Sequence, residues 1–179
     1  GSRLEQTKTI REQLPTIIRN LGVKSFLDIP CGDFYWMKQV RLELEEYIGA
    51  DILAQLIEHN RALYTGENRR FTVLDIMKDQ LPPVDLIFSR DCLVHFSFRD
   101  IRRTIRNIKR SHSKYLLTTT FTARDQNTDI TTGEWRPLNL QLPPFNFPEP
   151  IVLINEKCTE VDGRYPDKSL ALWRIADVP

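Results

Sequence analysis

Short apolar runs that alternate with helical stretches constrain this fold more than any other feature of the chain. The runs cover 25–29, 47–51, 71–75, 84–89 and 115–120. Each run is too short for a helix and is bounded by turn-forming residues, so we predict buried strands. Strands that alternate with amphipathic helices at these spacings indicate an α/β fold with a Rossmann-like, doubly wound, mostly parallel sheet.

Helices are expected before and between these strands. In the N-terminal helical segment, 1–22, Pro15 starts or kinks the last part and Gly22 is a natural stop. Asp33 is a candidate N-cap for a second helix, and Ser97 with Asp100 resembles a capping box for a later one. The expected inward-facing residues are Leu14, Ile17, Ile18 and Leu21; Phe34, Met37, Val40 and Leu44; Leu53, Leu56, Ile57 and Leu63; and Ile101, Ile105 and Ile108.

The regular alternation stops after residue 120. Segment 121–150 is rich in proline and shows no helical or strand period, whereas 151–157 and 170–175 are strand-like and close enough to pair. We therefore expect a seven-stranded sheet with an antiparallel C-terminal hairpin at one edge, in a single domain over 1–179. A long irregular segment is typical of a functional loop, and the aromatic residues of 121–150 favour a packed cap on the acceptor side.

Composition narrows the function classes. The formal charge of +1 gives no global attraction for nucleic acid or membrane, and no apolar run reaches the length of a spanning helix. Three scattered cysteines and three histidines without ligand spacing argue against disulfides and a bound metal, and they favour a cytoplasmic location. The start Gly1-Ser2 is typical of a cleaved tag, so a native targeting signal could precede it.

Acidic residues end three successive predicted strands: Asp28, Asp51 and Asp75. The carboxyl ends of parallel strands form the ligand crevice of such sheets, and grouped carboxylates are costly unless they meet a cationic or donor-rich ligand. S-adenosylmethionine (SAM) offers an ammonium, two ribose hydroxyls and an amino group. A dinucleotide fits less well, because only Gly32 remains of the glycine-rich turn that a pyrophosphate needs.

The motifs LDIPCGDF, IGADI, VLDI and DLIFSRDCLVHF occur in this order between residues 25 and 120. Together they resemble the successive motifs of class I SAM-dependent methyltransferases. The tail, with GEWRPLNLQLPPFNFPEP, INEKCTE and KSLALWRI, is similar to a bacterial group of such enzymes without an assigned substrate. The chain departs from the family at the first motif, where Pro30 and Phe34 replace two of the three usual glycines and Gly32 keeps the third, so we expect Phe34 to point away from the cofactor.

The resemblance implies a SAM site at the strand ends. Asp28 and Gly32 would face the methionine part, Asp51 the ribose, and Asp75 with Ile76 the adenine. The full set implied for the cofactor is Asp28, Pro30, Cys31, Gly32, Asp51, Ile52, Asp75, Ile76 and Arg90. The competing interpretation of the acids is a turn or helix cap, and Cys31 is interpreted as a small turn residue rather than a nucleophile.

His95 and Asp91 are the candidate catalytic residues. The resemblance puts Arg90 and Asp91 near the transferring methyl group, and a histidine titrates near neutral pH. Methyl transfer needs a base only if the acceptor loses a proton. The alternatives are that His95 packs or orders its loop and that Asp91 caps a loop or pairs with Arg90.

Four residues are candidates for acceptor binding: Trp135, Arg136, Asn139 and Trp36. The polar and aromatic mixture around Trp135 is typical of a binding lid. The alternative is that Trp135 covers a sheet edge and Trp36 packs in the core.

A basic stripe consists of Arg99, Arg102, Arg103, Arg106, Lys109 and Arg110. A solvated helix face is the preferred interpretation, and a phosphate-bearing or nucleic-acid acceptor is the alternative. Because the domain is compact and shows no recognisable nucleic-acid module, we expect an enzyme that methylates a small polar metabolite or saccharide. A nucleic-acid or protein methyltransferase, an oxidoreductase and a non-catalytic SAM-fold module remain as alternatives.

Overall fold

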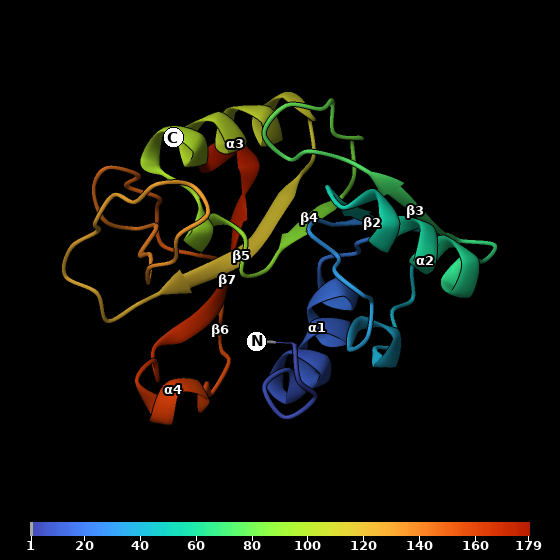
Figure 1. Cartoon of the computed structure of the whole chain (residues 1–179), viewed down its shortest axis with the longest axis horizontal. Helices are drawn as coiled ribbons and strands as arrows, with labels where there is room; N and C mark the ends of the chain where they lie inside the picture. The colour runs from blue at the N-terminus through green and yellow to red at the C-terminus, as the bar shows by residue number, and fades with distance from the viewer. Residues whose placement is uncertain (1) are drawn as a thin grey trace.

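A computed structural model describes residues 2–179 and contains one seven-stranded sheet in the order β3-β2-β1-β4-β5-β7-β6. Strands β1 to β5 run parallel, whereas β7 is antiparallel to both β5 and β6. The strands are β1 Ser25–Asp28, β2 Glu46–Asp51, β3 Arg69–Val73, β4 Leu86–Ser89, β5 Tyr115–Phe121, β6 Val152–Asn155 and β7 Lys168–Arg174. The predicted mostly parallel sheet with an antiparallel hairpin at its edge is confirmed (Figure 1).

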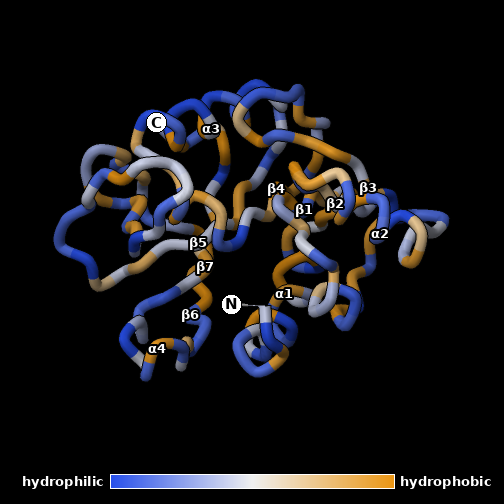
Figure 2. Tube along the Cα trace, viewed as in Figure 1, coloured by the Kyte–Doolittle hydropathy of each residue, from blue (hydrophilic) through white to orange (hydrophobic). Residues whose placement is uncertain are grey.

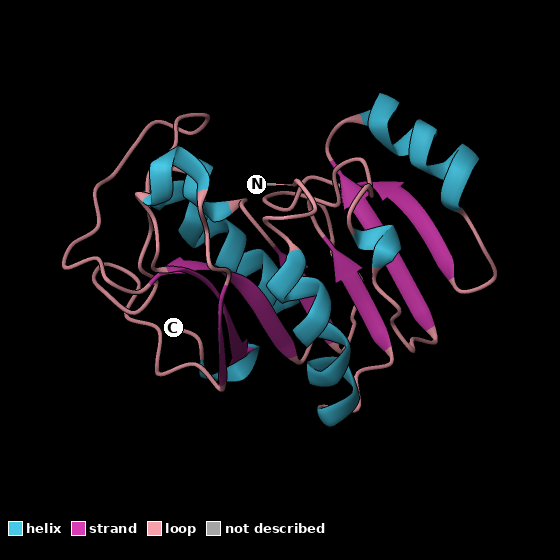
Figure 3. Ribbon diagram, turned by 90° about the horizontal axis from the view of Figure 1, so that it is seen from below, coloured by secondary structure: helices cyan, strands magenta, loops and turns pink. Residues whose placement is uncertain are grey.

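Helices cover both faces of this sheet (Figure 3). The α-helices are α1 Lys8–Asn20, α2 Ala54–Tyr64, α3 Phe98–Arg110 and α4 Glu160–Gly163, with short 3₁₀ helices at Met37–Gln39, Leu93–His95 and Ile175–Asp177. Side chains alternate along each strand, so that Phe26 faces α1 and Leu27 faces α3. The sheet therefore separates two hydrophobic cores, and the apolar trace of the strands runs through the middle of Figure 2.

Helix α1 runs over Lys8–Asn20 within the predicted helical segment 1–22, of which Gly1 lies outside the described residues. Leu14, Ile17 and Ile18 are buried against the sheet, as expected, and Pro15 lies inside the helix. Gly22 ends the segment with a φ of +62°, a left-handed conformation that glycine adopts without a steric penalty.

The predicted helix after β1 is wrong. Only a 3₁₀ turn, Met37–Gln39, forms there. Asp33 does not cap a helix; its Oδ1 accepts a hydrogen bond from the Tyr35 amide at 3.1 Å and closes a turn. Phe34 has a φ of 58°, which is incompatible with α-helix, and its ring packs against Tyr47 and Phe71. Phe34 is buried in this aromatic cluster.

Helix α2 is also less buried than its pattern suggested. Ile57 lies in the core, but Leu53 and Leu63 are 61% and 58% exposed. The helix contacts mainly β2 and β3, at the open edge of the sheet, so only one side of it has a partner.

Helix α3 follows the prediction closely. Ser97 Oγ accepts a hydrogen bond from the Asp100 amide at 3.2 Å, and Ile101, Ile105 and Ile108 are buried. The basic residues lie on the opposite, solvent-facing side or at its margins.

Segment 121–150 has no α-helix, and its only strand residue is Phe121, the last of β5. It packs on the same face as α3, with Leu138, Leu140, Phe145 and Phe147 in the core. Trp135 is 41% exposed and is less buried than its aromatic character suggested. The segment thus takes the place of further helices on this face.

No helix among the described residues has the length and apolarity needed to cross a membrane.

Candidate functional site

A cavity of about 320 Å³ lies beyond the carboxyl ends of β1, β2 and β4. It is lined by Ser2, Asp28, Pro30, Cys31, Gly32, Asp33, Trp36, Asp51, Phe88, Arg90 and Asp91. We call it the strand-end cavity. Most of the residues expected at the cofactor, as well as Trp36, are brought together here.

Asp28 is the most deeply buried acid of the strand-end cavity. Its Oδ2 accepts a hydrogen bond from the Tyr47 hydroxyl at 2.5 Å. Burial raises the pKa of Asp28 to about 7, and the nearby Asp51 adds to this, whereas the Tyr47 hydrogen bond and Arg90 act in the opposite direction. The site therefore holds an acid whose negative charge is only partly compensated.

Asp51 fixes the turn that follows β1. Its Oδ2 accepts from the Gly32 amide at 3.2 Å and its Oδ1 from the Leu53 amide at 3.1 Å. Asn60 donates to the Gly32 carbonyl at 2.7 Å, while its own Oδ1 is buried without a partner. Gly32 has a φ of +58° and open space where a Cβ would stand, so the turn leaves room beside Asp51.

Cys31 occupies this turn as a small buried residue. Burial, together with Asp28 and Asp51, raises the pKa of its thiol well above the ordinary value, which disfavours the reactive thiolate. Cys31, Cys92 and Cys158 are all free and buried.

The remaining residues expected at the cofactor do not line this cavity. Asp75 accepts from the Met77 amide at 2.9 Å and pairs with Lys78 at 3.0 Å, which is the turn-capping arrangement considered as the alternative. Ile76 is buried in the core, and Ile52 is 58% exposed.

A second cavity, of about 400 Å³, adjoins the first through Asp91. Its lining is Asp91, His95, Phe121, Trp135, Cys158, Glu160, Val161, Tyr165 and Lys168. Phe121, Trp135 and Tyr165 meet edge to face, with ring centroids 4.9 to 6.0 Å apart, and form an aromatic wall. We call this second cavity the aromatic cavity.

Backbone hydrogen bonds join the segment that carries His95 to the segment that carries Trp135. The Gly133 amide donates to the His95 carbonyl at 2.8 Å, and the Arg136 amide donates to the Val94 carbonyl at 3.1 Å. The Nδ1 of His95 lies 3.0 Å from the Glu134 carbonyl. With Nδ1 donating to this carbonyl, Nε2 is left as the basic nitrogen.

Arg136 and Asn139 do not reach the aromatic cavity. The Arg136 guanidinium donates to the carbonyls of Leu93, Phe96 and Thr128 at 2.8 to 3.2 Å. Asn139 accepts from the Gln141 amide and donates to the Arg124 carbonyl. Both side chains hold segment 121–150 in shape, and we do not carry them forward as acceptor contacts.

Asp91 is held by an unusual set of contacts. Its backbone is left-handed, with a φ of 54°, and its amide donates to Thr119 Oγ1 at 2.8 Å. Lys168 Nζ donates to Asp91 Oδ2 at 2.8 Å, and Arg90 Nη1 lies 3.2 Å from the same oxygen. Burial opposes ionisation of Asp91, but the two cations outweigh it and hold its pKa below the ordinary value.

Lys168 and Glu156 are site residues that sequence reasoning missed. Glu156 binds Arg90 with two hydrogen bonds, at 2.7 and 3.2 Å, across 66 positions of the chain. In the sequence, each of them is only a charged residue at the end of an apolar C-terminal strand. The chain has many such charges, so this pattern does not single them out.

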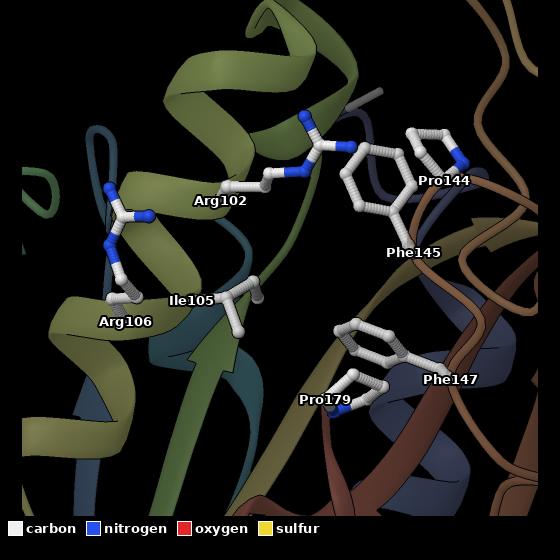
Figure 4. Close-up of a pocket in the computed structure, with 7 residues that line it drawn as sticks. All are labelled: Arg102, Ile105, Arg106, Pro144, Phe145, Phe147 and Pro179. Atoms are coloured by element: carbon white, nitrogen blue, oxygen red, sulfur yellow. The ribbon is translucent and has the colours of Figure 1, made fainter.

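A third cavity, of about 240 Å³, lies between α3 and segment 121–150. Figure 4 shows Arg102 extending toward Phe145 and Arg106 on the far side of Ile105. None of its lining residues belongs to either of the first two cavities.

Comparisons with known proteins agree with this geometry. A family model described as a methyltransferase domain matches residues 26–114. No curated protein matches the chain by sequence.

Solved structures share the fold at low sequence identity. Human N-acetylserotonin methyltransferase, solved with SAM, is 12% identical with a TM-score of 0.64, over 94% of this chain and 52% of that one. The methyltransferase domain of bacterial CtHen1 is 9% identical with a TM-score of 0.56, over 64% of this chain and 66% of that one. CalS10, an amino pentose methyltransferase from Micromonospora echinaspora, is 13% identical with a TM-score of 0.54, over 65% and 51%.

The chain thus spans between half and two thirds of the length of these structures. The family match covers the strands that build the strand-end cavity, and the sheet order agrees with the predicted Rossmann-like fold. This chain therefore belongs to the class I SAM-dependent methyltransferases.

Proposed function

We propose that this protein transfers the methyl group of SAM to a hydroxyl of a small, neutral, polar molecule of the saccharide type. One observation carries the proposal: Asp91 lines both the strand-end cavity and the aromatic cavity, so ligands in the two cavities would meet at this residue. In-line displacement requires that kind of close, aligned approach.

The strand-end cavity suits SAM by its chemistry. Asp28 would receive the ammonium, because a cation there relieves the cost of a buried carboxylate. Asp51 would receive the ribose hydroxyls, and Arg90 is the one cationic side chain among the described residues of the lining, so it would face the methionine carboxylate. Pro30, Cys31 and Gly32 would form the floor. SAM, when bound, supplies an electrophilic methyl group.

Three residues of the expected cofactor site lie outside this cavity: Ile52, Asp75 and Ile76. Ile52 is exposed near the end of β2, so an adenine could cover it. Asp75 already has partners, so a contact with the adenine would require it to exchange the Met77 amide or Lys78 for the ligand.

The aromatic cavity suits a neutral, hydroxyl-rich acceptor. Trp135 and Tyr165 offer ring faces and edges to the apolar side of a sugar ring. The charges of Asp91 and Lys168 are paired with each other, so this side of the cavity offers hydrogen bonds without a strong excess of either sign.

Two residues would handle the proton of the attacking hydroxyl. His95 would accept it at Nε2, since its Nδ1 is engaged with the Glu134 carbonyl. Asp91 would orient the hydroxyl as a hydrogen-bond acceptor, because Arg90 and Lys168 stabilise its ionised form and make it a weak base.

The test has two stages. Calorimetry with SAM, its product S-adenosylhomocysteine (SAH), and NAD should give binding of the first two only. Transfer of an isotope-labelled methyl group should then be measured with a panel of monosaccharides and polyols, with RNA and a protein mixture as competing classes. Absence of SAH binding would overturn the methyltransferase assignment for this chain. Labelling of RNA or protein alone would overturn the proposed acceptor class.

A further inference from the structure

A closed ring of four charged side chains lies between the two cavities. Arg90 pairs with Glu156 at 2.7 Å, Glu156 with Lys168 at 3.4 Å, Lys168 with Asp91 at 2.8 Å, and Asp91 with Arg90 at 3.2 Å. Positive and negative groups alternate around the ring, so its formal charge is zero.

Three members of the ring are buried, Asp91 is partly buried, and the four come from segments that are distant in the chain. Arg90, Glu156 and Lys168 are 8%, 3% and 6% exposed. Arg90 and Asp91 follow β4, Glu156 follows β6, and Lys168 begins β7. The Glu156 amide donates to the Lys168 carbonyl at 2.9 Å, which fixes these two residues relative to one another. Loss of one member would leave an uncompensated charge in a poorly solvated place.

The ring also connects the two sites. Arg90 and Asp91 line the strand-end cavity, and Asp91 and Lys168 line the aromatic cavity. Glu156 lines neither, yet its two hydrogen bonds to Arg90 fix the direction of that guanidinium. A paired, fixed set of charges at the junction would need little reorganisation during transfer.

We propose that Glu156 and Lys168 are positioning residues for methyl transfer, which hold Arg90 and Asp91 at the junction and keep its net charge at zero. This inference rests on the proposed function, because it assumes that SAM occupies the strand-end cavity. SAM differs from SAH by one methyl group and one positive charge on sulfur. The ratio of their affinities therefore measures the electrostatic environment of that sulfur.

The experiment uses three variants of the full chain: Glu156→Gln, Lys168→Met and the double variant. Glu156→Gln leaves the ring with one excess positive charge and should reduce the preference for SAM over SAH by about threefold to tenfold. Lys168→Met leaves one excess negative charge and should increase the preference by a similar factor. The double variant is neutral and should return the ratio to within about twofold of the unmodified protein.

Lys114→Met is the matched control. Lys114 forms an ion pair with Asp85 at 2.6 Å, at the opposite end of the sheet from both cavities. The control should leave the ratio unchanged. Melting curves are recorded for every protein, and Glu156→Gln, which keeps the side-chain shape, gives the test if Lys168→Met fails to fold.

Opposite shifts that cancel in the double variant support the inference, because a purely structural role lowers stability without changing the ratio in a charge-dependent direction. Unchanged ratios in folded variants, or shifts of the same sign, overturn it. If the unmodified protein binds neither SAM nor SAH, the proposed function fails first, and the two failures are therefore distinguishable.

Discussion

The two cavities of this methyltransferase shift the pKa of their carboxylates in opposite directions. In the strand-end cavity, burial raises the pKa of Asp28 to about 7, although Tyr47 and Arg90 partly compensate. In the aromatic cavity, burial also opposes ionisation of Asp91, but Arg90 and Lys168 outweigh it and lower its pKa. The strand-end cavity therefore lacks positive charge that a ligand can bring, whereas Asp91 in the aromatic cavity already has two cations beside it.

This difference bears on which ligand each cavity would take. A cation entering the strand-end cavity is stabilised by relieving the charge of Asp28 and Asp51, whereas a cation beside Asp91 has to compete with two cations already in place. The contrast matches a SAM ammonium on one side and a neutral acceptor on the other.

The largest effect is expected for Asp28→Asn. Because the pKa of Asp28 is about 7 in the folded protein and 3.8 ordinarily, the folded state holds its proton more tightly. Stability should therefore fall as pH rises from about 4 to 7. Asn carries no charge, so the variant should be more stable than the unmodified protein at pH 8, by at most about 4 kcal/mol, with the difference vanishing near pH 4. Urea unfolding at both pH values measures this.

Asp85→Asn is the control with the opposite sign. Burial is the largest single influence and opposes its charge, but hydrogen bonds from Lys114 and the amides of Lys24 and Ser25 together outweigh it and lower the pKa of Asp85 to about 2. Its loss should destabilise the protein at pH 8, and the loss should shrink as pH falls from about 4 toward 2. Equal pH profiles for the two variants would contradict the contrast between compensated and uncompensated acids.

The second effect concerns affinity. Asp51→Ala should weaken SAH binding about 30-fold to 100-fold, since charge-assisted hydrogen bonds contribute about 2 to 3 kcal/mol and the Gly32 turn loses its anchor. Calorimetry gives the affinity, and circular dichroism checks the fold. Asp177→Ala, an exposed acid far along the chain, should bind as before. An Asp51→Ala protein with full affinity would remove Asp51 from the cofactor site.

The residues at the strand ends could be predicted from the sequence, whereas the long-range contacts could not. Asp28, Gly32 and Asp51 stand at or just after the ends of strands, so the strand pattern and the order of the motifs are enough to locate them. The register of β1 against β2 then brings the Asp28 and Asp51 ends together. Local patterns are also sufficient for α3, because its cap and apolar face lie within one continuous segment.

The failures arose where long-range contacts override local pattern. Phe34 adopts a left-handed backbone to pack against Tyr47 and Phe71, which prevents the helix that the apolar spacing indicated. Lys168 meets Asp91 across 77 positions, and no periodicity in a single sequence encodes such a pair. Arg136 was interpreted as a ligand contact because the sequence does not distinguish an exposed arginine from a buried one whose guanidinium donates to backbone carbonyls.

The third prediction concerns binding of the acceptor in the aromatic cavity. Trp135→Ala should raise the KM for the saccharide that the transfer panel identifies by about tenfold, because an aromatic contact contributes about 1 kcal/mol beyond the area it buries. SAH affinity should stay unchanged. Trp36→Ala should give the reverse pattern, since Trp36 lines the strand-end cavity and lies 5.9 Å from the Arg90 guanidinium. If both variants change the same constant, the two cavities do not divide the ligands as proposed.

The smallest effect is expected in the third cavity. Arg102 and Arg106 form no ion pair or hydrogen bond with any of residues 2–179, and their cavity is separate from the other two. The double variant Arg102→Gln/Arg106→Gln should therefore change transfer to a small neutral acceptor by less than about twofold. A nucleic-acid acceptor would behave differently, since each lost phosphate contact weakens binding and flattens its salt dependence. If transfer to RNA falls steeply in this variant while SAH affinity stays intact, the acceptor binds at the basic face of α3 and not in the aromatic cavity. Unchanged transfer to the saccharide would leave that face as the solvated side of a helix.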